Sequence, residues 1–297
     1  MHFGFLNVMK PPGMTSHDVV ARVRRLSKIK RTGHGGTLDP LAEGVLPMAL
    51  GQACRLIDYL PSDKTYYAEI LLGKRTTTDD LEGEVLEQMD ASHITAEQIE
   101  AVLPHFVGTI KQHPPVYSAI RINGKHLYEL ARQGQAPEKA PERTVIVHDL
   151  DVVFVRPPVF AIRVHCGKGT YIRSLARDMG ALLGTGGVLQ KLVREKAGNL
   201  HISKSLTLEN LQEQIGKTDW QSIFTDLAEA LGLCKVDVTK SDADDIFNGR
   251  IIDLPDPPAN EQFLLAVQNG CYIGLLKHTQ ENQFKPEVVF SDARVST

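Results

Sequence analysis

The 297-residue sequence has no apolar run that approaches the about 18 residues needed for a membrane-spanning helix. Its apolar start, residues 1–9, is too short for the hydrophobic segment of a signal peptide or for a span. We therefore expect a protein of the cytoplasm with no membrane partner.

Cysteine is also scarce. The four cysteines, Cys54, Cys166, Cys234 and Cys271, lie far apart and form no C-x-x-C pair. This spacing argues against a structural zinc site and against a disulfide framework, so we expect reduced thiols packed as small apolar side chains. The acidic segment 76–84 lacks the EF-hand spacing, and we expect no metal there.

Several enzyme signatures are missing. No G-x-G-x-x-G follows a predicted strand, and no G-x-S-x-G occurs. The segment 167–170, Gly-Lys-Gly-Thr, does not complete a P-loop, because Gly169 stands where Ser or Thr must follow the lysine. The sequence therefore excludes the dinucleotide-binding, α/β-hydrolase and P-loop nucleotidase signatures.

Positive charge is confined to the first two thirds of the chain. Residues 1–204 carry 26 Lys and Arg against 21 Asp and Glu, whereas residues 205–261 carry 4 against 12. Residues 22–31 alone hold six cations and no acid. Such a cluster can follow a phosphate backbone, although the same pattern is typical of a solvated helix face.

The most distinctive segment present is glycine-rich: residues 31–47 read RTGHGGTLDPLAEGVLP. Glycine permits positive φ and close backbone approach, and Pro40 disfavours helical backbone at Asp39, which predicts a stiffly presented carboxylate. No second acid occurs before Glu43, so paired-carboxylate chemistry has no local support. Asp39 is either a lone nucleophile or orienting base, or a solvated turn residue.

The remaining pattern predicts a mixed α/β chain of the α+β class in two domains. The first, residues 1–234, has predicted strands at 3–9, 65–72, 144–155 and 159–166, predicted helices at 15–26 and 95–103, and an acidic helical end at 205–233. Within it, the basic excursion 121–143 is expected to clamp a polyanion. Residues 235–297 are expected to form a small β-rich domain with strands at 263–267, 271–276 and 287–290.

Four segments in order resemble the TruB family of tRNA pseudouridine synthases. They are Lys10–Ser16, Gly33–Pro47, Asp63–Tyr66 and Lys168–Ser174. The resemblance covers roughly residues 3–200. It implies the pseudouridine-synthase fold, a largely antiparallel mixed sheet flanked by helices, with a PUA-like C-terminal domain.

The resemblance also implies an activity: isomerisation of uridine to pseudouridine at position 55 in the T loop of tRNA. Base flipping would present the uridine, and neither cofactor nor metal would be needed. The substrate partner is the T-stem-loop of tRNA, and the family member acts as a monomer with no protein partner.

Roles carry over residue by residue. Asp39 matches the essential aspartate, which attacks C6 of the uracil or C1′ of the ribose. Tyr66 matches the tyrosine that stacks on the base and helps to remove the C5 proton, and Arg173 matches the arginine that pairs with the aspartate. A guanidinium beside a lone carboxylate favours its ionised, nucleophilic form.

Five further residues are expected to bind substrate. His34 would fill the space left by flipped bases, which offsets a flipping cost of about a few kcal/mol by stacking. Leu192 would line the pocket, Arg194 would contact phosphate or base, and Lys10 and Tyr171 belong to the matching segments. Two other interpretations stay open: a non-catalytic RNA-binding or tRNA-folding protein, and a guide-directed member of the same superfamily.

Overall fold

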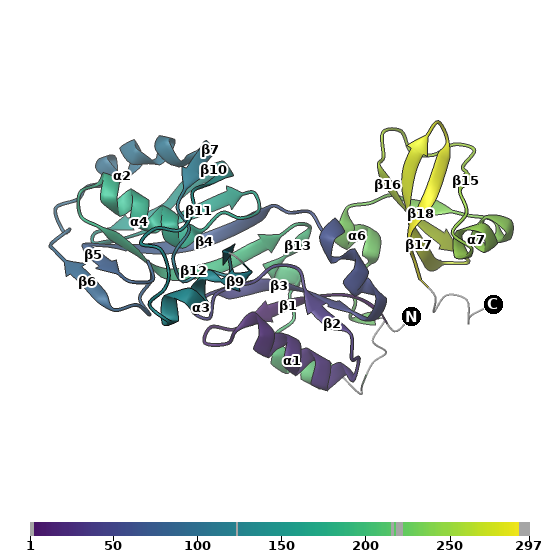
Figure 1. Cartoon of the computed structure of the whole chain (residues 1–297), viewed down its shortest axis with the longest axis horizontal. Coiled ribbons are helices and arrows are strands. Elements are labelled where there is room, and N and C mark those ends of the chain that lie inside the picture. The colour runs from purple at the N-terminus through teal and green to yellow at the C-terminus, as the bar shows by residue number, and fades with distance from the viewer. Residues whose placement is uncertain (1–2, 123, 215–216, 218–221, 291–297) are drawn as a thin grey trace.

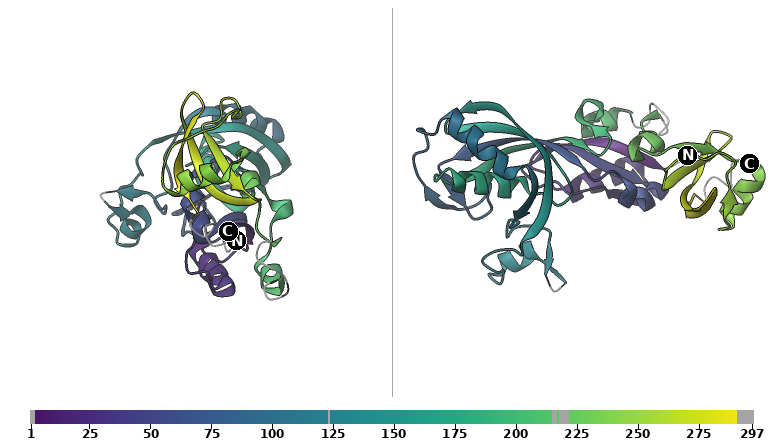
Figure 2. Two further views of the ribbon diagram at one scale, coloured as in Figure 1. Left: turned by 90° about the vertical axis from the view of Figure 1, so that its right-hand side faces the viewer. Right: turned by 90° about the horizontal axis from the view of Figure 1, so that it is seen from above.

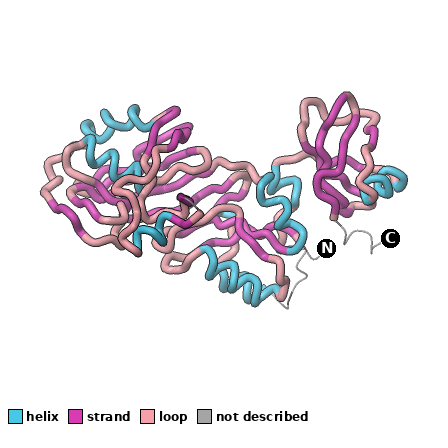
Figure 3. The backbone as a smooth tube through the Cα atoms, in the orientation of Figure 1, coloured by secondary structure: helices cyan, strands magenta, loops and turns pink. Residues whose placement is uncertain are grey.

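The computed structural model describes residues 3–122, 124–214, 217 and 222–290. Parts of three predicted regions lie outside the described residues: residue 123 of the basic excursion, residues 215–216 and 218–221 of the acidic helical end, and residues 291–297 of the C-terminal domain. Within the described ranges, no helix is long and apolar enough to cross a membrane. Strands form two groups, with the helices around them (Figure 3).

The main sheet runs in the order β1, β3, β12, β4, β11, β10, β7, with β2 paired to β3 and β13 to β12. Its strands are β1 (Gly4–Lys10), β2 (Thr32–His34), β3 (Glu43–Leu50), β4 (Lys64–Leu72), β7 (Gly108–Gln112), β10 (Arg143–Arg156), β11 (Val159–Cys166), β12 (Gly187–Ala197) and β13 (Leu200–His201). The pairing of β12 with β3 is parallel, and the other pairings between these named strands are antiparallel. The predicted largely antiparallel mixed sheet is confirmed.

Helix α1 (Ser16–Ser27) corresponds to the helix predicted at 15–26. Thr15 is its N-cap and forms a capping box with Asp18, which satisfies backbone donors at the helix start. The buried face contains Val19, Val20 and Val23 and packs on apolar side chains of β1 and β3. This packing fixes α1 next to the glycine-rich loop that follows it.

The other half of the sheet is covered by helices α2 (Ala96–Val102) and α4 (Ile172–Leu182); in Figure 1, α4 lies beside β4, β11 and β12, and α2 lies nearer to β7 and β10. Alternate residues of β4 are buried, as its period-two pattern predicted. These include Tyr66, Ala68 and Ile70, which join one core cluster with Leu175 of α4. Tyr66 is thus part of the same packed layer as α4.

Two short antiparallel pairs stand apart from the main sheet. One is β5 (Lys74–Thr76) with β6 (Val85–Gln88), and the other is β8 (Arg121–Ile122) with β9 (Lys125–His126), followed by α3 (Leu127–Arg132). The second pair and α3 project from the body of the molecule, as both views of Figure 2 show. Their core is small, formed by Ile120, Leu127 and Ala140.

The C-terminal sheet has the order β14, β16, β17, β18, β15. Its strands are β14 (Lys235–Asp237), β15 (Ile252–Asp253), β16 (Phe263–Gln268), β17 (Cys271–Gln280) and β18 (Gln283–Val289), with α7 (Lys240–Phe247) beside them. The predicted β-rich C-terminal part is confirmed.

An apolar cluster joins the two sheets. The rings of Phe3 and Phe290 lie 4.8 Å apart, and the ring of Tyr59, at the end of the 3-10 helix η1 (Gly51–Tyr59), meets that of Phe263 edge-on at 5.1 Å. Arg55 also donates to the carbonyl of Val289 at 2.7 Å. The C-terminal sheet therefore packs directly against Phe3 and η1 of the first part of the chain.

The acidic segment 205–233 differs from the prediction. The helices described there are short, with α5 at Leu208–Gln214 and α6 at Leu227–Leu231. Residues 223–226 are not helical, and Asp226 caps α6 by accepting hydrogen bonds from the backbone amides of Ala228 and Glu229. An N-cap aspartate marks the start of a new helix, and the acidic composition alone did not distinguish this aspartate from the other acidic residues of the segment.

Candidate active site

A pocket of about 260 Å³ opens where three segments that are distant in the sequence meet. They are the glycine-rich loop at residues 36–39, the start of β4 at Lys64 and Tyr66, and the turn into α4 at residues 167 and 169–173, and Ser118 and Ala119 also line the pocket. Leu192 of β12 completes one wall. The pocket therefore depends on the order of strands in the sheet, because β12 and β4 are distant in the sequence but pair in the sheet.

The glycine-rich loop is held from two sides. Ser16, at the start of α1, exchanges hydrogen bonds with the backbone of Leu38: its hydroxyl donates to the carbonyl at 3.1 Å and accepts from the amide at 2.9 Å. On the other side, Pro40 accepts from the amide of Gly13 at 2.8 Å. Asp39 lies between these anchors, and its side chain is 35% exposed.

A buried arginine meets Asp39. The Nε atom of Arg173 lies 2.9 Å from Oδ2 of Asp39, although its N–H does not align with that oxygen, so the contact is an ion pair rather than a hydrogen bond. The two terminal nitrogens of Arg173 donate to the carbonyls of Thr78 and Tyr117, each at 3.0 Å. These bonds leave the guanidinium few other orientations.

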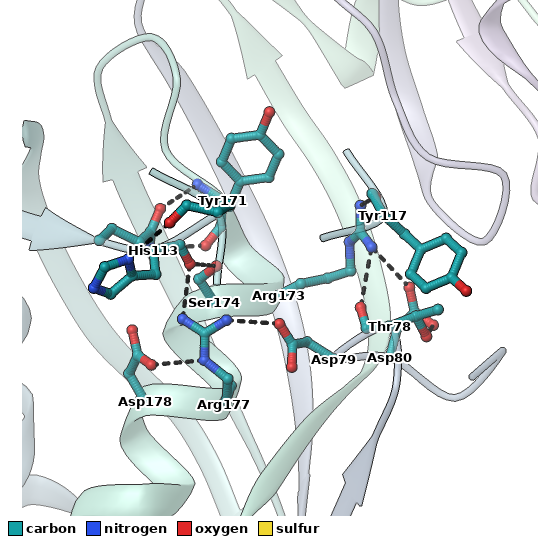
Figure 4. A network of polar contacts seen from close by, with 12 residues as sticks. Thr78, Asp79, Asp80, His113, Tyr117, Tyr171, Arg173, Ser174, Arg177 and Asp178 are labelled. Carbon is teal, nitrogen blue, oxygen red and sulfur yellow. Dashed lines mark hydrogen bonds and ion pairs between the residues drawn. The ribbon is translucent and has the colours of Figure 1, made fainter. Parts of the chain in front are cut away.

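Arg173 also lies near a second carboxylate, that of Asp80, 3.5 Å from Nη1. Asp80 is nearly inaccessible, and it accepts hydrogen bonds from the Thr78 hydroxyl and from the amide of Glu82. Figure 4 shows Arg173 reaching Thr78 and Asp80 beside Tyr117. Asp80 therefore partly balances a buried positive charge that Asp39 alone would have to balance.

One turn further along α4, Arg177 ties down the same loop. It donates to Asp79 and to the carbonyl of His113, each at 2.8 Å, and pairs with Asp178 at 2.9 Å (Figure 4). Burial raises the pKa of Asp79, and the charge of Arg177 opposes that rise. The i, i+4 spacing of Arg173 and Arg177, visible in the sequence, thus serves one loop.

Tyr66 lies in the pocket wall with little exposure. Burial raises the pKa of its phenol, because an anion in this apolar layer would lose hydration. Its ring is therefore a neutral, flat surface next to Asp39, suited to stacking on a base.

Two buried cations stand behind the loop. Arg194 has no exposed surface and donates to the carbonyls of Val45 at 2.7 Å, Thr37 at 3.2 Å and Gly36 at 3.0 Å. This burial argues against the RNA contact expected of Arg194, because a phosphate could not reach the guanidinium without displacing the loop. Its bonds instead hold the loop in place.

Lys10 is equally buried. Its ammonium donates to the carbonyls of Pro11 at 2.9 Å and Pro40 at 3.2 Å, and burial lowers its pKa to about 8. The nearby Asp39 charge opposes that lowering. Like Arg194, Lys10 contacts loop backbone where substrate binding was expected.

The other predicted substrate-binding residues are placed differently. Tyr171 and Leu192 line the pocket, and the backbone of Tyr171 exchanges two hydrogen bonds with the side chain of Gln112, at 2.8 and 3.0 Å. His34 lies on β2, half-buried, outside the described lining, with its ring edge-on to His17 at 6.1 Å. Burial lowers the pKa of His34, so this imidazole favours its neutral form.

Family models match most of the chain. The N-terminal domain model of TruB family pseudouridylate synthase matches residues 24–172, and the tRNA pseudouridylate synthase B C-terminal domain model matches residues 173–231. A protein of Synechocystis sp. named tRNA pseudouridine synthase B is 48% identical over 86% of this chain and 87% of its own length. Its namesake in Gloeothece citriformis is 44% identical over 97% of both chains.

Solved structures are also similar. A chain in a structure of an H/ACA RNP bound to a substrate RNA containing 2′-deoxyuridine has a TM-score of 0.72 and 25% identity, and the match covers 97% of this chain and 85% of that one. A chain in a Cbf5–Nop10–Gar1 complex has the same TM-score, 26% identity and the same coverage. The similarity therefore spans both sheets.

Proposed function

Because this chain belongs to the TruB family of pseudouridylate synthases, we propose that it isomerises uridine to pseudouridine at position 55 in the T loop of tRNA, with Asp39 as the nucleophile. The observation that carries the proposal is the ion pair of Asp39 and Arg173 in a pocket walled by Tyr66. The rest of the mechanism is built on these three side chains.

The target uridine must first leave its stack, because a carboxylate inside a protein pocket cannot reach a base in a folded loop. Extrusion costs about a few kcal/mol, and stacking on an aromatic ring offsets part of it. We assign this stacking to Tyr66 of the pocket wall. We further propose that His34, which is outside the pocket lining, fills the space left in the RNA.

Asp39 then attacks C6 of the uracil or C1′ of the ribose. In either route the bond from N1 to C1′ breaks, the base turns, C5 bonds to C1′, and the bond to Asp39 then breaks and frees the carboxylate. The C5 proton leaves and N1 gains one, so the product is an isomer of the substrate. A neutral phenol cannot accept the C5 proton, so we assign Tyr66 to stacking. Tyr66 could accept that proton only after another base had removed the proton of its hydroxyl.

Arg173 acts on Asp39 through its charge and position. A guanidinium beside a carboxylate stabilises the anion, which is the nucleophilic form. Its two bonds to loop carbonyls fix where that charge lies, so Asp39 is oriented without having to reorganise during attack.

Exposed cations supply the electrostatic attraction to tRNA. All six basic residues of the segment 22–31 are exposed, as are Arg121, Lys125, Arg132 and Lys139 in the projecting insertion. Neutralisation of phosphates by such residues provides much of the affinity of RNA-binding proteins. We propose that the insertion 121–143 clamps the T-stem-loop against the pocket.

The proposal extends to organisation. We propose a catalytic domain at 1–234 and a C-terminal domain at 235–297, acting in the cytoplasm as a monomer without guide RNA, protein partner, metal or cofactor in the reaction. Asp39 and Arg173, which form the ion pair in the pocket, both belong to the first of these domains.

The test uses purified full-length protein and an unmodified tRNA transcript. We expect pseudouridine at position 55, none in a transcript with cytidine there, and none with the Asp39→Asn variant, which keeps the shape of the side chain. Turnover by Asp39→Asn would remove the nucleophile assignment. Inactivity of the wild-type protein on bare tRNA would favour the guide-directed alternative.

A further inference from the structure

Three side chains that the reaction does not use meet on the surface beside the pocket. They are Asp63, which precedes β4, His148 of β10 and His165 of β11. One potential ligand atom from each lies within 4.8 Å of the others, and Nε2 of His148 is 3.5 Å from Oδ1 of Asp63. The two imidazole rings have their centres 4.8 Å apart.

Strand pairing and a β-bulge bring these three residues together. His165 pairs with Thr65 of β4, so it lies beside the start of the strand that Asp63 leads into. The β10–β11 register shifts between Val147 and Asp149, which leaves His148 as the extra residue of a β-bulge. A bulge re-aims a side chain, and here it gives two successive exposed residues, His148 and Asp149.

The cluster has the composition of a metal site with open positions. Two imidazoles and one carboxylate suit divalent first-row transition-metal ions, and the hard ions Mg²⁺ and Ca²⁺ prefer all-oxygen sets. Bonds of about 2.0–2.2 Å to such an ion place tetrahedral ligands about 3.3 Å apart. The pair of Asp63 and His148 already has nearly that spacing, and exposed side chains can rotate to close the rest.

The surroundings leave the carboxylate available. Asp63 is half exposed, and the ammonium of its neighbour Lys64 donates to the carbonyl of Ser62 at 2.6 Å rather than to Asp63. The adjacent Cys166 thiol is fully buried, so it does not compete as a ligand on the surface. Gly167, which lines the pocket, faces the cluster: a Cβ there would lie 3.9 Å from both Asp63 Oδ1 and His148 Nε2.

We propose that Asp63, His148 and His165 bind one divalent transition-metal ion, such as Zn²⁺ or Ni²⁺, at the rim of the uridine pocket. Three protein ligands leave at least one coordination position for water or for an oxygen of an incoming phosphate. This site is independent of the proposed isomerisation, and it would exist whether or not Asp39 is the nucleophile.

The experiment is calorimetric titration of NiCl₂ and ZnCl₂ into the full-length protein, freed of any histidine tag. The double variant His148→Ala/His165→Ala is compared with a control, His93→Ala/His105→Ala, which removes two other exposed histidines. Loss of an outer-shell group alone weakens metal binding about 10–100-fold, so loss of two ligands should weaken it by at least about 100-fold. The control should bind one ion with wild-type affinity.

Asp63→Asn provides a second, near-isosteric variant, and its affinity should fall while its thermal midpoint stays near that of the wild type. Co²⁺ absorption in the visible range should report nitrogen and oxygen ligation in the wild type and not in the double variant. Equal affinity of the wild type and the double variant, or absence of a one-to-one complex, would overturn the proposal.

Discussion

The Nε atom of Arg173, in helix α4, lies 2.9 Å from the carboxylate of Asp39. Asp39 belongs to the glycine-rich loop, more than a hundred residues earlier in the chain. Only 5% of the arginine side chain is exposed, against 35% of the aspartate side chain. The cation is thus the buried, fixed partner and the anion is the accessible one. An accessible carboxylate on a fixed cation is the arrangement that a nucleophile needs.

Removing the Arg173 charge should destabilise the fold as well as stop the reaction. In Arg173→Met the buried Asp80 and the carbonyls of Thr78 and Tyr117 lose their partner, which costs about 3 kcal/mol for a broken buried pair. The measurement is urea unfolding followed by circular dichroism. Arg163→Met, which breaks the exposed pair with Glu195, is the matched control and should cost less than about 1 kcal/mol; equal losses would contradict the assignment.

Asp80 should act as a positioning residue. Asp80→Asn keeps the side-chain size but removes the negative charge 3.5 Å from Arg173, so the guanidinium should shift toward Asp39. We expect kcat to fall by up to about 100-fold, as for small misplacements of reacting groups, with KM for tRNA little changed. Steady-state kinetics test this split. A rise in KM with kcat intact would place Asp80 in RNA binding instead.

The buried Lys10 should leave a signature in the pH dependence of stability. Burial lowers its pKa from the ordinary 10.5 to about 8, so between these values the unfolded chain binds a proton that the folded chain does not. The free energy of unfolding contributed by this residue therefore rises with pH across that window, and the cost of burying the charge is fully present below it.

Lys10→Met has no such proton to lose. The stability of the wild type relative to Lys10→Met should increase between about pH 8 and pH 10. Urea unfolding of both proteins at pH 7.5 and pH 9.5 measures the difference. A constant difference across this range would mean that the ammonium is solvated and not buried.

Binding to tRNA should depend steeply on salt through the segment 22–31. Arg25→Gln/Lys30→Gln removes two exposed cations, and each lost phosphate contact should reduce the slope of log affinity against log salt by about 0.9. Filter binding of tRNA at several KCl concentrations gives the slope. Lys240→Gln/Arg250→Gln, in the C-terminal part, is the control for net charge alone. An equal reduction of the slope in this control would show that the segment 22–31 has no specific role in tRNA binding.

Local sequence signals predicted the elements that carry Asp39 and Tyr66. The helix at 15–26, which precedes the loop of Asp39, was predicted from its N-cap candidates Thr15 and Ser16 and its apolar face, and β4 was predicted from its alternation. The position of β12 was not predicted. Its pairing with β3 on one side and β4 on the other is a relation between distant strands, and no local period encodes it.

The sequence alone singled out the residues that we propose carry the chemistry, through a lone aspartate before Pro40, an arginine at the start of a helix, and four ordered motifs of one family. Only the tertiary structure decided which way the charged side chains act. Lys10 and Arg194 turn inward because carbonyls of the glycine-rich loop lie there to accept their hydrogen bonds. Asp80 became part of the site for the same reason, since a buried arginine attracts whichever carboxylates the fold brings near, however far apart they are in the chain.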